Sequence, residues 1–110
     1  MALMDDLWKQ KLTTNVFTGK FYSVEFGVDG IKYSYQFKLW NGCSGKNFVL
    51  VKENSKIIEK LHAGDRFNMK YHSINANLPS ELIDTEITDI TIEKNGRFKG
   101  HYLMELAPLN

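Results

Sequence analysis

The sequence predicts an all-β, mainly antiparallel domain, a six-stranded barrel with one short helix. Apolar and polar residues alternate with period two in several segments, as in half-buried strands. Two dipeptides, Asp29-Gly30 and Asn95-Gly96, favour the tight turns that join such strands. Aromatic residues make up 13% of the chain and are spread along it, which suits a pleated core. A closed barrel would protect the strand edges.

Length and charge limit the function classes. The 110 residues fit one domain, and the net charge is only +1. Because a protein that binds nucleic acid mainly through phosphates is usually more basic, we expect no DNA or RNA partner. The single cysteine, Cys43, forms no intrachain disulfide and favours a reducing compartment. We expect a cytoplasmic protein without membrane insertion, since the acidic residues Asp5 and Asp6 near the N-terminus do not fit a signal peptide or a membrane span.

Residues 1–14 are expected to form an N-terminal arm or short helix, ahead of a barrel domain at 15–110. Met4, Leu7, Trp8 and Leu12 fall at helical spacing.

The first two strands are predicted on either side of the Asp29-Gly30 turn. Each alternates strictly, so each has one inward face. The inward residues are Tyr22, Val24, Phe26 and Val28 before the turn, and Ile31, Tyr33, Tyr35, Phe37 and Leu39 after it.

A polar loop at 41–46 separates this hairpin from a short strand at 48–51. Asn54 can cap a short helix that runs to about His62, with an apolar stripe, and Gly64 suits its C-terminal end. The stripe is Ile57, Ile58 and Leu61. A further strand follows, with Phe67, Met69 and Tyr71 inward.

The last two strands flank the Asn95-Gly96 turn, after a loop at 73–81. The inward parity changes between Ile87 and Ile90, which predicts a β-bulge near Thr88-Asp89. The closing strand is expected to begin at Phe98, with Gly100 allowing a bend. The inward residues are Ile83, Thr85, Ile87, Ile90 and Ile92, then Phe98, Tyr102, Met104 and Leu106.

The order of these elements resembles the PilZ domain family over about residues 20–106. Four stretches carry the resemblance: the strand, loop and strand at 37–51, the Leu-His-Ala-Gly-Asp-Arg-Phe turn at 61–67, the long strand at 85–92 and the closing strand at 98–106. PilZ domains are six-stranded barrels, and many bind the bacterial second messenger cyclic di-GMP. The resemblance therefore implies this fold and this ligand.

The family's binding motifs are altered here. Its Asn/Asp-x-Ser-x-x-Gly loop corresponds to Asn41, Cys43 and Lys46, so a thiol replaces the hydroxyl and a lysine replaces the glycine. Its Arg-x-x-x-Arg segment is absent, because no arginine precedes Arg66. Lysine offers charge but no planar fork for guanine. The candidate ligand-binding residues are Trp40, Asn41, Cys43, Ser44 and Lys46, with Lys9, Lys11 and Lys20 ahead of the first strand.

No catalytic constellation stands out. Cys43 has no assignable base, and the spacings of His62, His72 and His101 match no compact metal motif, so we expect no enzyme, metal or cofactor. The acidic run at 81–89 suits a solvated strand face. We therefore expect a non-catalytic regulatory module in cyclic di-GMP signalling, with an altered, weak or lost nucleotide site. The alternative is a protein-interaction adaptor on the same scaffold, which does not bind the nucleotide. Trp40 is open to two interpretations, a ligand or partner anchor and a locally packed side chain.

Overall fold

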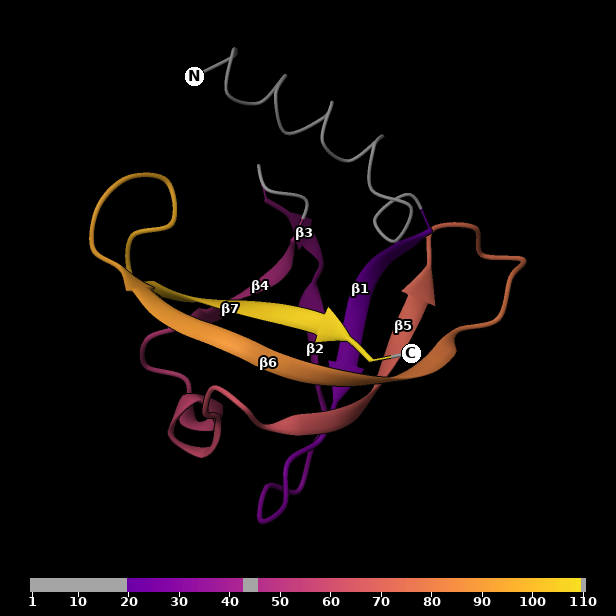
Figure 1. The fold of residues 1–110 in the computed structure, drawn as a ribbon, viewed down its shortest axis with the longest axis horizontal. Coiled ribbons are helices and arrows are strands. Elements are labelled where there is room, and N and C mark those ends of the chain that lie inside the picture. Colours follow the sequence, from indigo (N-terminus) through magenta and orange to yellow (C-terminus); the bar gives the residue numbers. More distant parts are fainter. Residues whose placement is uncertain (1–19, 43–45, 110) are drawn as a thin grey trace.

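The computed structural model describes residues 20–42 and 46–109 as one antiparallel sheet that curls into a nearly closed barrel (Figure 1). The expected all-β antiparallel fold is confirmed. The elements are β1 (Phe21–Phe26), β2 (Tyr35–Lys38), β3 (Trp40–Asn41), β4 (Asn47–Lys52), the 3-10 helix η1 (Lys56–Lys60), β5 (Arg66–Ser73), β6 (Glu81–Glu93) and β7 (His101–Pro108). The expected arm at 1–14 lies outside the described residues.

One segment of chain closes the barrel. The sheet order is β2-β1-β5-β6-β7-β4-β3, and its two end strands are separated in sequence only by Leu39. β2 pairs with β1 and β3 pairs with β4, so the same run of residues joins both ends of the sheet. Leu39 breaks the ladder but donates its N–H to the carbonyl of Tyr22 (2.9 Å). The sheet therefore has seven strands rather than the expected six, because the chain forms the additional strand β3 just beyond the expected strand end at Leu39.

The first hairpin has the expected turn but a different register. Gly30 has φ +86°, and Ile31 N–H donates to the carbonyl of Val28 (3.1 Å). A two-residue turn would pair Phe26 with Tyr33, yet Phe26 pairs with Tyr35. The register is thus offset by two residues from that of a two-residue turn, and residues 27–34 all lie between the two strands. The prediction that Tyr33 faces inward is wrong: it lies in this loop and is 71% exposed.

A register shift at the start of β1 corrects a second expectation. Between Phe21 and Ser23 the pairing with β5 slips by one residue. Phe21 and Val24 therefore both face the core, although they are three residues apart. Tyr22, expected inside, is 52% exposed.

The expected helix is a single 3-10 element. η1 begins after Ser55, which makes no side-chain capping bond, so the predicted cap at Asn54 and the end at His62 are both wrong. The apolar stripe is real, because Ile57 and Leu61 are buried. Tertiary burial, rather than capping, holds this turn against the barrel.

The long strand β6 contains the expected bulge. Its register with β7 shifts between Ile87 and Asp89, which leaves Thr88 as the extra residue. The chain after η1 is tied to the same place, since Gly64 N–H donates to the carbonyl of Ile87 (2.7 Å). The bulge thus lets both halves of β6 present apolar residues to the interior, with Ile87 before it and Ile90 after it. Ile92, which was also expected inside, is 37% exposed, so that expectation is wrong.

The second hairpin is looser than predicted. Gly96 and Gly100 both have positive φ, and β7 begins only at His101. Phe98 therefore lies in the connection and not on the inward face of β7, where it was expected. The wider loop carries Phe98 to the outside of the barrel.

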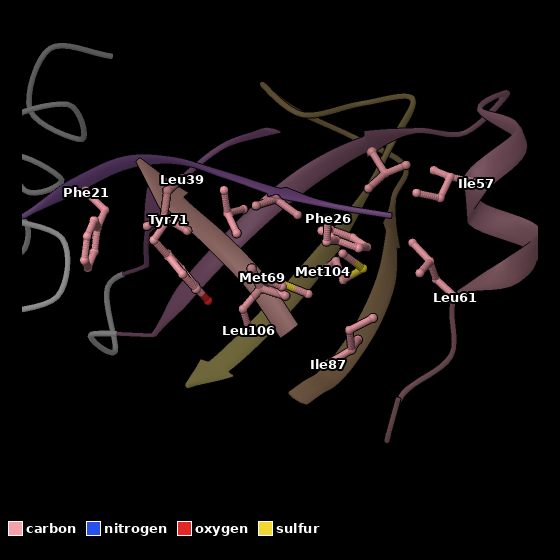
Figure 2. Close-up of a cluster of buried hydrophobic side chains, with 13 residues drawn as sticks. Phe21, Phe26, Leu39, Ile57, Leu61, Met69, Tyr71, Ile87, Met104 and Leu106 are labelled. Carbon is pink, nitrogen blue, oxygen red and sulfur yellow. The ribbon is translucent and has the colours of Figure 1, made fainter. Parts of the chain in front are cut away.

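Figure 2 shows the interior, where side chains from both halves of the sheet and from η1 meet. The alternation predicted for β5 is confirmed, because Met69 and Tyr71 are fully buried. The buried cluster comprises Phe21, Val24, Phe26, Leu39, Val49, Val51, Ile57, Leu61, Met69, Tyr71, Ile87, Met104 and Leu106.

Candidate functional site

An aromatic cluster lies outside the barrel, at the end of the closing segment. Trp40 on β3 pairs directly with Phe48 on β4, so both side chains project from the same face. Because Val49 faces the core, its neighbour Phe48 projects from the opposite face of β4, where it is only 3% exposed. The two rings stack, with centroids 6.2 Å apart and 15° between planes. Phe98, from the β6–β7 loop, meets Trp40 edge-on at 5.3 Å. We call Trp40, Phe48 and Phe98 the outer aromatic cluster.

Two cations lie over this cluster. The Lys38 ammonium is 4.1 Å from the centroid of Trp40, and the Arg97 guanidinium carbon is 5.4 Å from it. Arg97 is also 5.6 Å from the ring of Phe98. Exposed cation–π contacts contribute about 0.5–1 kcal/mol each, so these cations are held in place only weakly. The cluster thus places positive charge beside packed aromatic rings, of which Trp40 and Phe98 are half-buried and Phe48 is buried.

Asn41, a predicted site residue, faces the other way. Its side chain is only 1% exposed, and it pairs across β3–β4 with Asn47, which is 5% exposed. Among the described residues, Asn47 Oδ1 is buried without a hydrogen-bond partner. A ligand on the outer face does not reach Asn41 while the strand keeps this orientation. Alternation carried on from the inward Leu39 would have indicated this placement.

Lys46 stands at the far side of the loop, next to β4. Its ammonium is exposed and lies 3.6 Å from Glu105 Oε1. The loop is closed at its base, because Gly42 N–H donates to the carbonyl of Lys46 (2.8 Å). Cys43 and Ser44 lie outside the described residues, as do Lys9 and Lys11.

Lys20 lies on the opposite side of β1 from Trp40. Its ammonium pairs with Glu81 at 2.8 Å, at the start of β6, and its carbonyl accepts a bond from Ile74 N–H (2.9 Å). These contacts direct Lys20 toward β5 and β6, whereas Trp40 follows β2 on the other side of β1. The structure therefore groups Trp40 with Lys38 and Arg97, not with Lys20.

Arg97 is the residue that sequence reasoning missed. The two arginines have different surroundings: Arg66 Nε lies 3.2 Å from Glu86 Oε1 on the outside of β5–β6, whereas Arg97 lies over the outer aromatic cluster. The only sequence signal was its position between the Asn95-Gly96 turn and Phe98. That signal indicates an exposed loop but not which distant strand the loop reaches.

Several other ionisable groups form pairs between neighbouring strands or loops. Ser34 Oγ donates to Glu25 (2.8 Å) and His72 Nε2 lies 3.0 Å from the same carboxylate, and these two contacts lower the pKa of Glu25. In the acidic run at 81–89, Asp84 accepts a hydrogen bond from Asn68 (2.8 Å) on the outer face of the sheet. Within residues 20–42 and 46–109, no three His, Cys, Asp or Glu side chains converge as metal ligands would.

A second surface feature lies at the β1–β5 end of the barrel. An open groove of about 520 Å³ is bordered by Tyr22, His72 and the loop that precedes β6. Ile74 and Leu78 from that loop are both more than half exposed. Solvent-exposed apolar side chains gathered around one groove are typical of interaction surfaces.

None of the helical structure described for this chain has the length and apolar character of a membrane span. Comparisons with family models, curated proteins and solved structures find no match to this chain.

Proposed function

We propose that this protein is a non-catalytic regulatory module of PilZ type that binds cyclic di-GMP through an altered site on the outer aromatic cluster. The single observation that carries the proposal is the grouping of Trp40 with the cations of Lys38 and Arg97, at the strand end that leads into the loop at 42–46. Cyclic di-GMP presents planar bases and phosphates, which this combination of aromatic ring and positive charge suits.

Stacking supplies most of the affinity in this proposal. A base on an aromatic side chain contributes about 1–3 kcal/mol, whereas an exposed cation–π contact such as that of Lys38 contributes about 0.5–1 kcal/mol. The Lys38 ammonium would lie close enough to pair with a phosphate. Asn41 acts indirectly here, as an inward residue that fixes the end of β3, and Lys46 borders the site from β4.

A titration tests the proposal. Adding cyclic di-GMP to ¹⁵N-labelled protein is expected to shift amide signals around 38–48 and 97–98, with heat measurable by calorimetry. Trp40→Ala should weaken binding about tenfold or more. Tyr33→Ala is the matched control, since Tyr33 is an exposed aromatic residue outside the cluster. Equal affinities in the two variants would contradict a Trp40 stack.

A charge-matched pair sharpens the test. Lys32 and Lys38 are both exposed lysines of the first hairpin, but only Lys38 lies over Trp40. Lys38→Ala is expected to lower the affinity and its salt dependence, whereas Lys32→Ala leaves both unchanged. If the two substitutions act alike, the positive charge operates at long range and not at this site.

The groove bordered by Tyr22, Ile74 and Leu78 favours a second candidate, a protein-interaction adaptor that does not bind cyclic di-GMP. A folded protein that shows no heat and no shifted amides at millimolar nucleotide would support this alternative and reject the first.

A further inference from the structure

We infer that the second half of β6, residues 89–93, is a docking edge for an extended peptide of a partner protein in which apolar residues alternate with lysine or arginine. Such a peptide would add one strand to the sheet, with its backbone paired to β6. The inference is independent of the proposed nucleotide site, because none of the residues that carry it belongs to the outer aromatic cluster.

The second half of β6 is paired on one side only. β5 accompanies β6 as far as Glu86, whereas β7 accompanies it to Glu93. Ile87 adds one bond to the chain before β5, because its N–H donates to the carbonyl of Asp65 (2.8 Å). In the part of the chain that the structure describes, no strand pairs with residues 89–93 on that side. Figure 1 shows this half of β6 running on past the start of β5.

The backbone groups on this edge have the spacing that a further strand needs. Glu93 directs its carbonyl toward β7, where it accepts a bond from Gly100 N–H (3.1 Å). Alternate residues of an antiparallel strand direct their N–H and C=O groups to opposite edges, so those of Ile92 and Ile90 point away from β7. Within the described chain, these groups of Ile90 and Ile92 meet no backbone partner on that edge. Unpaired groups of this kind are a template for strand addition.

An apolar groove lies beside this edge. Its volume is about 410 Å³, and its border includes Ile58, Leu61, Ile90 and Tyr102. Ile90 packs against the buried cluster but is only half-buried. Residues that lie opposite Ile90 in an added strand would project to the same face of the sheet. Apolar residues at those positions would therefore leave water and contact the groove.

The charges on the other face decide the occupant. Asp89 and Glu93 alternate with Ile90 and Ile92, so they project from the opposite face of β6. If a second copy of this edge paired antiparallel, with Ile90 opposite Ile92, Asp89 would lie opposite Glu93, and like charges at such positions are destabilising. Lysine or arginine opposite either carboxylate is stabilising instead. The edge therefore suits a foreign peptide with basic residues at alternate positions better than it suits a second copy.

Amide hydrogen exchange of the full chain tests this inference with synthetic peptides. The probe has about seven residues, with lysine and valine in alternation. One control replaces each lysine by glutamate, and a second keeps the composition but groups the lysines at one end. At about ten times its dissociation constant, the probe is expected to slow exchange at Ile90 and Ile92 about tenfold, because a bound strand closes these amides. Neither control peptide should protect them.

Charge reversal on the protein supplies matched variants. Asp89→Lys and Glu93→Lys should each weaken binding of the lysine–valine probe about twofold to fivefold and favour the glutamate–valine peptide. Asp84→Lys is the control, since Asp84 lies on the half of β6 that β5 already accompanies. Amide spectra verify that each variant is folded.

Protection of Ile90 and Ile92 by the probe, together with its weakening in the two edge variants, would support the inference. Equal binding of the three peptides, binding that leaves these two amides unprotected, or no binding at millimolar peptide would overturn it. Protection that is already present in the free protein would also overturn it, because the edge would then be covered. Sedimentation would in that case show whether a second copy or the same chain covers it.

Discussion

The hydroxyl of Tyr71 on β5 lies 2.8 Å from Thr85 Oγ1 on β6, inside the barrel, where both side chains are fully buried. The Thr85 hydroxyl donates its own proton to the carbonyl of Ile83 (3.0 Å). Because a threonine hydroxyl has only one proton, Tyr71 is the donor in this pair. The two bonds form a short directional chain within an otherwise apolar core.

Removing the Tyr71 hydroxyl is expected to destabilise the fold modestly. Tyr71→Phe deletes one buried hydrogen bond and keeps the ring, which costs about 0.5–1.5 kcal/mol of unfolding free energy. Tyr22→Phe, at an exposed tyrosine, is the control and should stay within about 0.5 kcal/mol of wild type. Urea unfolding at pH 7 measures both, and a larger loss in Tyr22→Phe would argue against the buried pair.

Alkaline pH should destabilise the wild type through the same residue. Burial raises the pKa of Tyr71 to about 12, from an ordinary value near 10. The folded state keeps the phenol protonated where the unfolded state loses its proton. The stabilising contribution is therefore complete below about pH 10 and is lost as the pH rises through 12, by roughly 2–3 kcal/mol. Comparing wild type with Tyr71→Phe across pH 9–12 isolates this contribution; parallel curves would contradict it.

Glycine is required at position 64 because of the backbone conformation there, and not because a larger side chain would lack space. Its φ is +97°, and an added Cβ would meet no atom within 4 Å. Gly64→Ala should nevertheless cost about 1–2 kcal/mol, since this φ disfavours L side chains. Gly27→Ala is the control, because its φ is ordinary and its Cβ would meet only Ser34 at 3.9 Å. Thermal unfolding of the two variants gives the answer, and an equally stable Gly64→Ala would show that steric space, not φ, is what matters there.

Deleting Thr88 should be far more harmful than substituting it. Without the bulge, the two halves of β6 cannot both direct apolar residues inward, so either Ile87 or Ile90 turns to solvent. We expect a loss of more than about 3 kcal/mol for the deletion and less than about 0.5 kcal/mol for Thr88→Ala. Circular dichroism melts distinguish these results. A deletion variant as stable as Thr88→Ala would mean that the bulge does not set the register.

The carboxyl of Glu25 should titrate below the usual range. The hydrogen bond from Ser34, followed by that with His72, lowers its pKa. The resulting stabilisation is present above the pKa of the unfolded chain and is lost as the pH falls through the folded value. Ser34→Ala should raise the pKa of Glu25, whereas Ser55→Ala should leave it unchanged. Side-chain carboxyl ¹³C shifts report the titration, and an unmoved Glu25 would exclude the role of Ser34.

The sequence predicted strand parity well for β5 and around the bulge of β6, although not at the start of β1. Phe67, Met69 and Tyr71 alternate as expected, and the change of parity after Ile87 marked the bulge correctly. Period-two alternation reflects a property of the backbone, namely that neighbouring side chains point to opposite faces. The alternation can therefore be recognised in the sequence without knowing which strands lie on either side.

Where each ladder begins was not predictable from turn dipeptides. Asp29-Gly30 does form a turn, but in the second hairpin the hydrogen-bonded turn begins at Gly96 and runs to Lys99. In both hairpins pairing starts several residues away from the dipeptide, which leaves Tyr33 and Phe98 in loops. Glycine fixes only the local φ, whereas the register depends on cross-strand packing. The grouping of Arg97 with Trp40 is of this kind: it arises from a loop that crosses to a strand remote in sequence, and no local pattern encodes it.

The last strand along the chain, β7, lies between β6 and β4 rather than at an end of the sheet. During synthesis, all the other strands leave the ribosome before β7. Until then, β6 and β4 each lack the strand that pairs with both of them. The barrel consequently assembles only after translation has delivered residues 101–108. Nascent chains stalled before that point, with two incomplete ladders and an open interior, are the species most prone to associate with one another.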